Sequence, residues 1–330
     1  MTIKKNLFHK MINILHGVSD SCLEFSSIFI APLISRMAQS GAGTNRCLIF
    51  KCLPIPVHYY SPIPDIDELE KRNVWEMVSP LNGIHFQSDK QIELLTFLGK
   101  KFGHECDWPI KAQKGDKFCL DNPSFSFGCA ASLYSIIRNF QPERIIEIGS
   151  GNSSFVIQEA LTKNATDGGH IGSHIIVDPY PNHDVKKYYE KSIQLCEKPV
   201  ECLDPSFFLQ LEKNDILFID SSHSVKCGSD VNFLILEILP ILQSGVIIHF
   251  HDIPLPYEYP KIYATNPKFR MFWTESYLLQ AFLCCNNRFE ILLAMHYLMK
   301  EHAILLQQLF PAYYREQPSR TSGSFWIQKK

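Results

Sequence analysis

Two glycines one residue apart, Gly149 and Gly151, follow a short apolar run at residues 145–148. An apolar pattern of helical period continues at residues 155–161. A strand, a glycine turn and a helix in this order let a nucleotide-like ligand approach bare backbone at a helix N-terminus. The stretch therefore predicts a ligand-binding loop. Its residues are Gly149, Ser150, Gly151, Asn152 and Ser153.

The acid Glu147, two residues before the first glycine, indicates what kind of ligand this is. A carboxylate is poorly placed for a pyrophosphate, because both groups are anionic. It suits a ligand that carries a cationic amino group and no phosphate. We therefore expect S-adenosylmethionine (SAM) rather than NAD, with Glu147 among the cofactor-binding residues. The structural alternative is an ordinary strand-to-helix turn of an α/β protein.

Other polar residues follow two further apolar runs. Asp178 comes directly after residues 175–177, while Asp220 and Ser221 come after residues 216–219. Ligands of open α/β sheets bind beyond the carboxyl ends of the strands, and an acid after the second strand can accept hydrogen bonds from ribose hydroxyls. We therefore assign all three to the cofactor site. The alternative for Asp178 is a turn residue before Pro179.

Two histidines accompany these acids. His223 follows Asp220 closely, and His251 and Asp252 follow the apolar run at residues 245–250. Neighbouring strand ends face one crevice, so an imidazole there can act as a general base. We predict that His251 or His223 accepts a proton and that Asp252 orients the site. Histidine and aspartate are also usable ligands of a divalent cation, an alternative that we leave open without predicting a metal.

Several motifs together resemble one protein family. The sequence Glu147-x-Gly149-x-Gly151 resembles the first motif of class I SAM-dependent methyltransferases, with Ser153 at the third glycine position. Residues 125–330 resemble a bacterial branch called methyltransferase family 24, through segments 218–223, 228–231, 251–260 and 275–283. The resemblance implies that residues 149–154, Asp178 and the Asp220 region hold SAM, and that His223, His251 and Asp252 line the acceptor side. Cys129 departs from the polar or acidic residue expected at its position.

Alternating patterns indicate the elements that position these residues. The fold class is α/β, a Rossmann-like, seven-stranded, mostly parallel sheet with helices on both faces and a helical or irregular N-terminal extension. The resemblance implies that the last strand is antiparallel. Residues 123–330 form the predicted SAM-binding methyltransferase domain, and residues 1–122 form the extension, a candidate substrate cap. Strands are expected at 145–148, 175–177, 200–202, 216–219, 245–251, 289–292 and 323–327, and helices at 65–77, 89–102, 130–140, 155–161, 186–196, 231–242 and 273–285.

Composition restricts the partners and the compartment. The 330 residues have a formal net charge of -2 and contain no dense Lys/Arg stripe, so we expect no nucleic-acid partner. The eleven cysteines are scattered without a Cys-x-x-Cys pair, which is typical of free thiols in the cytoplasm. The N-terminal residues do not resemble a secretory signal. The apolar run at residues 25–34 is short and contains Pro32, so we expect no membrane span. Within it, residues 28–34 are expected to pack on the core, with membrane-surface contact as the alternative.

The predicted function is transfer of a methyl group from SAM to an oxygen of a small polar or sugar-like acceptor. One alternative is a nicotinamide-dependent oxidoreductase, because Gly149-x-Gly151-x-x-Ser154 partly matches the dinucleotide fingerprint. Another is an inactive methyltransferase fold that serves as a binding module, although acids at three strand ends argue against decay. A homo-oligomer is compatible with the sequence.

Overall fold

The structure is a computed structural model that describes residues 18–189, 191–268, 270–313 and 322–330. The expectation about a secretory signal concerns the first 17 residues and lies outside the described part. The chain divides into two compact units, Met1–Arg72 and Asn73–Lys330. Each unit is described by itself.

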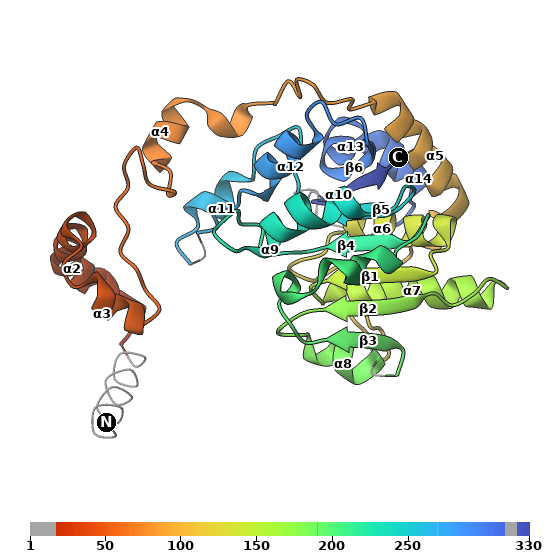
Figure 1. The fold of residues 1–330 in the computed structure, drawn as a ribbon, viewed down its shortest axis with the longest axis horizontal. Helices are drawn as coiled ribbons and strands as arrows, with labels where there is room; N and C mark the ends of the chain where they lie inside the picture. The colour runs from red at the N-terminus through yellow and green to blue at the C-terminus, as the bar shows by residue number, and fades with distance from the viewer. Residues whose placement is uncertain (1–17, 190, 269, 314–321) are drawn as a thin grey trace. The chain divides into compact units, whose positions relative to one another are not determined.

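The second unit is built on a sheet of seven strands in the order β3-β2-β1-β4-β5-β7-β6 (Figure 1). Strands β1 to β5 pair in parallel, and β7 runs antiparallel between β5 and β6. This arrangement confirms the predicted fold class, including the antiparallel last strand. The strands are β1 Arg144–Ile148, β2 Ser173–Val177, β3 Ile193–Cys196, β4 Ile216–Ile219, β5 Ile247–Phe250, β6 Phe289–Ala294 and β7 Phe325–Lys329.

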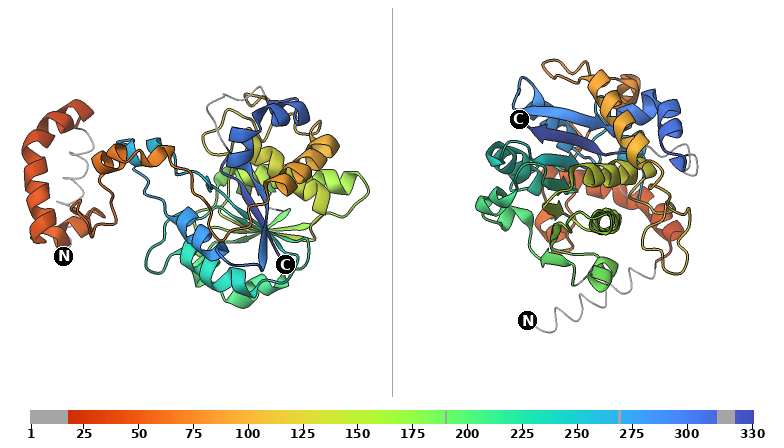
Figure 2. Two further views of the ribbon diagram at one scale, coloured as in Figure 1. Left: turned by 90° about the horizontal axis from the view of Figure 1, so that it is seen from above. Right: turned by 90° about the vertical axis from the view of Figure 1, so that its right-hand side faces the viewer.

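Helices cover both faces of this sheet (Figure 2). The first face packs against α5 Ser88–Phe102, α6 Phe127–Phe140, α7 Asn152–Thr166, α8 His183–Tyr189, α13 Met295–Glu301 and α14 Ala303–Leu309. The second face packs against η2 Val200–Cys202, η3 Pro205–Gln210, α9 Asp230–Asn232, η4 Phe233–Ile238, α10 Leu239–Ile241 and α12 Glu275–Leu283. Two short helices complete the unit, η1 Val74–Glu76 and α11 Lys261–Thr265.

Strand β1 shows why the central strands read as continuous apolar runs. Successive side chains alternate between the two faces of a strand. Ile145 joins the core of the first face, and Ile146 and Ile148 join the core of the second. Both faces are covered, so both sets must be apolar. Glu147 shares the first face with Ile145, below α7, and this placement decides its contacts.

The third strand was predicted in the wrong place. Residues 186–196 were expected to be helical, but α8 ends at Tyr189 and residues 193–196 form β3. The strand expected at residues 200–202 is the 3-10 helix η2. The reason is that β3 is an edge strand, paired only with β2 and half exposed. An edge strand can carry polar residues, so it lacks the apolar run that identifies a central strand.

The boundary between the compact units lies at Arg72/Asn73. The start of the SAM-binding domain at residue 123 stays a prediction. Helix α5 contributes Leu95 and Leu98 to the core of the first face. The segment before α5 is hydrogen-bonded to the same unit, since the Ser79 N–H donates to the Pro256 carbonyl at 2.7 Å. Gly99 lies where a Cβ would come 2.6 Å from the Leu309 Cβ. That close approach explains a glycine inside α5.

The first unit contains α2 Asp20–Ser40, α3 Thr44–Ile49 and α4 Ile66–Lys71. No residue of α2 is buried, so the prediction that residues 28–34 pack on the core is wrong. The apolar run is part of a 21-residue helix, because Ser19 caps its start and Gly41 ends it in the left-handed conformation. By length and composition alone, α2 could cross a membrane, which removes the argument that the segment is too short.

Candidate functional site

The loop between β1 and α7 has the geometry of a binding loop. Gly149 has φ +88°, and a Cβ there would lie 2.6 Å from the carbonyl oxygen of Asp220. Only glycine fits this position without strain. A Cβ on Gly151, by contrast, would meet no atom within 4 Å. The backbone at Gly151, which is the N-cap of α7, is therefore open to a ligand.

Glu147 does not face that opening. Its side chain is fully buried. One carboxylate oxygen accepts from Ser153 Oγ at 2.5 Å, and the other accepts from Ser154 Oγ at 2.8 Å and lies 2.8 Å from His174 Nε2. The expected direct contact with a ligand amino group is thus not what this structure shows, because the pleat of β1 turns the side chain under α7. Its part in the cofactor site remains a prediction, now through support of the loop.

The loops after β1 and β2 are tied together by predicted site residues. Ser150 Oγ donates to Asp178 Oδ2 at 2.6 Å, and the other Asp178 oxygen accepts from the Tyr180 N–H at 2.7 Å. Asn152 Nδ2 donates to Ser124 Oγ at 3.1 Å, which links the start of α7 to the segment before α6. The carboxyl ends of β1 and β2 therefore form one connected rim.

The next two strand ends bring four predicted residues together. His223 Nε2 lies 3.3 Å from Asp220 Oδ1 and 3.8 Å from Asp252 Oδ2. His251 Nδ1 lies 3.2 Å from Asp252 Oδ2 and 3.7 Å from Asp220 Oδ1. Two buried imidazoles thus alternate with two carboxylates that are partly open to solvent. Their roles remain predictions, but the expectation that β4 and β5 direct them to one crevice agrees with these distances.

Both sides of this cluster depend on an unusual backbone conformation. His223 and Asp252 each have φ +56°, the left-handed region that residues other than glycine seldom adopt. Such strain persists only where the surroundings hold the backbone in place, and it is frequent at functional sites. At Asp252 the neighbour is Gly323, where a Cβ would come within 2.6 Å of the Asp252 Cα.

Glu275 is a functional residue that the sequence argument missed. It is fully buried at the start of α12, where Ser221 Oγ donates to it at 2.9 Å. Its other oxygen lies 2.8 Å from His223 Nδ1. A carboxylate at the beginning of an otherwise apolar, buried helix was the available signal. Because Glu275 contacts both Ser221 and His223, it positions two predicted site residues at once.

These contacts decide the charge of His223 and Asp220. Burial alone would lower the pKa of His223, but the hydrogen bonds and charges of Asp220 and Glu275 raise it to about 10. Burial would raise the pKa of Asp220, yet His251 and His223 lower it to about 2. At neutral pH the pair is therefore an imidazolium and a carboxylate.

His251 lies in a different environment. Its two ring nitrogens are buried and make no hydrogen bond, although Nδ1 forms the ion pair with Asp252, and the ring stacks on Phe125 with centroids 5.4 Å apart. Burial lowers the pKa of His251, but Asp252, Asp220 and Cys129 together raise it well above the usual range. This is the one imidazole of the cluster that is held by charge and packing without a hydrogen bond.

Cys129 stands where the family resemblance led us to expect a polar or acidic residue. The side chain is buried, with Sγ 3.0 Å from Ser322 Oγ and 3.3 Å from Ser126 Oγ. Burial raises the pKa of the thiol, but His251 and the two hydroxyls lower it to about 6. The surroundings of Cys129 therefore favour the charged form of its side chain more than those of an ordinary buried thiol.

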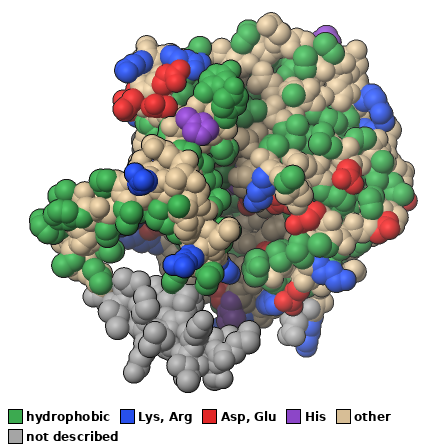
Figure 3. All heavy atoms as spheres, turned by 60° about the vertical axis from the view of Figure 1, so that its left-hand side comes forward, with side chains coloured by type: hydrophobic (Ala, Val, Ile, Leu, Met, Phe, Trp, Pro, Cys, Tyr) green, Lys and Arg blue, Asp and Glu red, His purple; other side chains and the backbone are tan. Residues whose placement is uncertain are grey.

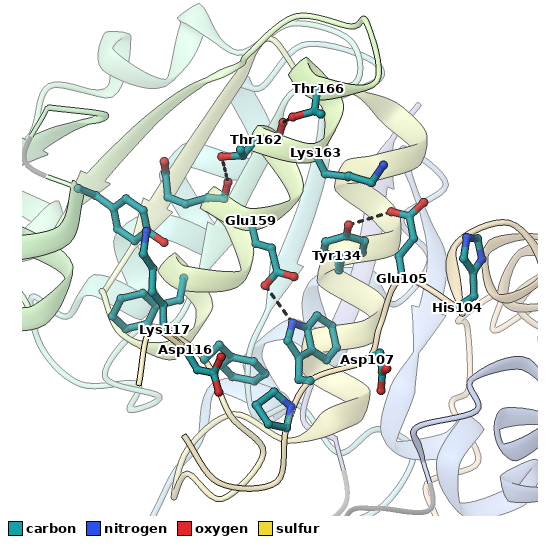
Figure 4. Close-up of a pocket in the computed structure, with 17 residues that line it drawn as sticks. His104, Glu105, Asp107, Asp116, Lys117, Tyr134, Glu159, Thr162, Lys163 and Thr166 are labelled. Carbon is teal, nitrogen blue, oxygen red and sulfur yellow. Dashed lines mark hydrogen bonds between the residues drawn. The ribbon is translucent and has the colours of Figure 1, made fainter. Parts of the chain in front are cut away.

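A separate pocket of about 830 Å³ lies beside α6 and α7 (Figure 4). Trp108 Nε1 donates to Glu159 at 2.9 Å, and the Tyr134 hydroxyl donates to Glu105 at 2.8 Å. None of the predicted site residues lines this pocket. Over the described residues, no group of three or more His, Cys, Asp or Glu side chains has the arrangement of a metal site.

A family model and a sequence relative each match part of this chain. Residues 146–253 match the model of a family described as a methyltransferase domain. An uncharacterised protein of Archaeoglobus fulgidus is 29% identical over 171 residues, which are 49% of this chain and 75% of that protein.

Two solved structures are similar over a large part of the chain. The plantazolicin methyltransferase BamL, in complex with a triazolic desmethylPZN analog and SAH, shares 14% identity at a TM-score of 0.36, covering 74% of this chain and 86% of its own. The plantazolicin methyltransferase BpumL, in complex with SAH, shares 13% sequence identity at a TM-score of 0.30. The match covers 80% of this chain and 97% of that chain. Both TM-scores are low, so the assignment depends on the strand order and the family match. The strand order is the one expected for a class I methyltransferase fold, and residues 146–253 match the model of the methyltransferase-domain family.

Proposed function

We propose that this protein is a SAM-dependent methyltransferase that acts on an oxygen of a small polar or sugar-like acceptor. The observation that carries the proposal is the joined rim of loops at the carboxyl ends of β2, β1, β4 and β5. In an open α/β sheet, ligands bind where the strand order reverses, and here it reverses at β1, between β2 and β4.

The residues of the rim fit the cofactor. The open backbone at Gly151 allows close approach, and the partly exposed carboxylate of Asp178 can accept hydrogen bonds from ribose hydroxyls. Asp220 and Ser221 extend the rim toward the histidine cluster. Bound SAM would supply an activated methyl group, and a methyl transfer then requires mainly that the acceptor be held in line with it.

Of the two base candidates, His251 is the better one. The pKa is raised in both imidazoles, so their contacts decide between them. His223 is held at both ring nitrogens, between Asp220 and Glu275. We therefore assign it a positioning role, as a cation that fixes Asp220. His251 has no hydrogen bond to break, so its ring can accept an acceptor proton once it is neutral. Asp252, in ion-pair contact, stabilises the imidazolium that results.

The acceptor side is narrow and polar. A small cavity of about 30 Å³ beside Asp252 is lined by Tyr259, Tyr263, His296 and Ser322 among others. The hydroxyl and imidazole groups in its lining can hydrogen-bond a hydroxyl-bearing acceptor, which an apolar acceptor would leave unpaired. This favours oxygen as the methylated atom.

Nicotinamide-dependent oxidation is the second candidate, because the glycine spacing partly matches that of dinucleotide-binding proteins. The antiparallel β7 and the family match favour methyl transfer instead. An inactive binding module would leave the buried charge cluster, with its strained backbone, without a use.

The test is incubation of the full chain with isotopically labelled SAM and fractionated small molecules of the host cell, read by mass spectrometry. The proposal expects one labelled product whose methyl group is bound to oxygen. The matched control is His251→Gln, which should bind SAM and form the product far more slowly. A product methylated on nitrogen or carbon would contradict the acceptor assignment, and oxidation of substrate with NAD would contradict the reaction itself.

A further inference from the structure

The exposed apolar surface of α2 has no use in methyl transfer. Seven large side chains of this helix are between 47% and 72% exposed, although each is a residue type that is usually buried. An exposed apolar surface of this extent on one element marks an interaction site. The seven residues are Leu23, Phe25, Ile28, Phe29, Ile30, Leu33 and Ile34, and we call them the apolar face of α2.

The two sides of α2 differ in character. At 100° per residue, the apolar face occupies about two thirds of the helix circumference. Asp20, Glu24, Ser27 and Ser35 form a narrower polar strip on the opposite side. Arg36 lies within the angular range of the apolar face but close to the helix end, where a long side chain can reach out to solvent or headgroups. The helix is therefore amphipathic.

The charge of the surrounding sequence indicates the partner. Residues 1–60 contain six Lys or Arg and two Asp or Glu, whereas the whole chain has a net charge of -2. The basic residues therefore concentrate around the apolar helix. The same combination of exposed apolar and basic side chains recurs at α3. Leu48 and Ile49 are exposed close to Arg46 in the sequence, and Phe50 is exposed next to Lys51. Apolar side chains beside basic ones match a membrane with anionic headgroups.

The length of the charge-free stretch decides how α2 meets this membrane. Glu24 and Arg36 enclose residues 25–35, which span about 16 Å of helix, roughly half of a hydrocarbon core of about 30 Å. A crossing helix would have to draw one of these charges into the hydrocarbon region. An in-plane helix keeps both at the headgroups.

We propose that α2 lies in the plane of a lipid membrane with anionic headgroups, with its apolar face inserted into one leaflet (exposed hydrophobic side chains are green in Figure 3). The catalytic unit then remains on a single side of the membrane. The eleven free cysteines of the whole chain suit the cytoplasmic leaflet. The methyltransferase thereby works next to a membrane surface.

Vesicle flotation of the full chain tests the proposal. Vesicles of phosphatidylcholine with phosphatidylglycerol should carry the protein, and pure phosphatidylcholine should carry much less. The double variant Phe29→Asp/Leu33→Asp should lose at least about tenfold in partitioning. The matched control is Phe97→Asp/Leu236→Asp, which alters the same residue types at similar exposure in the catalytic unit. Equal flotation of the two variants, or none by the native chain, overturns the proposal.

Brominated lipids test the depth of α2. Tryptophan fluorescence of Phe29→Trp should be quenched most by bromines near the headgroup end of the acyl chain, and Phe97→Trp should gain no quenching over the native chain. Strongest quenching by bromines at the methyl end would mean that α2 crosses the bilayer, and it would overturn the in-plane geometry. SAM binding by the Phe29→Asp/Leu33→Asp variant in solution should be unchanged. It serves as the folding control and keeps failure of this proposal separate from failure of the proposed function.

Discussion

His223 Nδ1 lies 2.8 Å from Glu275 Oε2, and both groups are buried. A raised imidazole pKa means that the folded state holds a proton that the unfolded chain releases more easily. The stability that His223 contributes is therefore complete below the unfolded pKa of about 6.5, and it is lost as pH rises towards about 10.

We predict that the difference in unfolding free energy between the native protein and His223→Gln shrinks, by an amount on the order of a few kcal/mol, between pH 6 and pH 10. Urea unfolding at both pH values measures it. Glu275→Gln, which removes one of the two raising charges, should show a weaker pH dependence. A difference that stays constant or grows with pH would contradict the assigned charge of His223.

The rate of methyl transfer should increase with pH above neutrality. His251 has its pKa raised by Asp252, Asp220 and Cys129 against the lowering effect of burial, so only a minority of molecules holds a neutral base at pH 7. Single-turnover rates with the acceptor found by the labelling experiment give the profile. His251→Gln should lose about 10²-fold or more and become nearly independent of pH. A profile left unchanged in this variant would remove His251 from the mechanism.

The two loop glycines should respond differently to alanine. In Gly149→Ala, the Cβ meets the Asp220 carbonyl at 2.6 Å in a left-handed backbone, so both stability and SAM binding should fall. Backbone strain alone costs about 1–3 kcal/mol. Gly168→Ala is the control for that strain, since it shares a positive φ (+89°) without any contact within 4 Å. Thermal unfolding should rank Gly149→Ala below Gly168→Ala.

Gly151→Ala should separate binding from stability. Its Cβ touches no protein atom and its φ of 171° is extended, so the melting temperature should be unchanged. The methyl group would project into the space that the ligand needs, so SAM affinity should fall at least about tenfold, or roughly 1.4 kcal/mol. Calorimetry measures the affinity. Unaltered binding would mean that the cofactor does not approach this backbone.

Glu147→Gln should destabilise the fold together with the loop. The buried carboxylate accepts hydrogen bonds from Ser153 and Ser154, and no solvent can replace it as their partner. Loss of a buried charged acceptor of this kind costs about 1–3 kcal/mol of unfolding free energy. SAM affinity should decrease in parallel, since the loop loses its support. Reduced affinity with unchanged urea unfolding would instead indicate the direct ligand contact that the sequence first suggested.

Central strands and their polar ends could be predicted because burial on both faces leaves a continuous apolar run, as in residues 145–148 and 216–219. The edge strand β3 has no such constraint, and it was missed. The direction of a side chain was a second feature that the sequence did not reveal. The acid Glu147 is visible in the sequence, but whether it points at a ligand or below α7 depends on the pleat of β1.

Contacts between site residues and distant segments of the chain were a third feature that the sequence did not reveal. Glu275 and Ser322 reach the site only through tertiary packing, so no spacing in the sequence announces them. The exposure of α2 was also hidden, because an apolar helix for the core and one for a membrane have the same composition.

The most direct test of the account is calorimetric titration of the purified full chain with SAM, S-adenosylhomocysteine and NAD. We predict saturable one-to-one binding of SAM and S-adenosylhomocysteine that Gly151→Ala weakens, and no binding of NAD. Binding of NAD with no heat from SAM would contradict the assignment of the β1–α7 loop and, with it, the proposed reaction.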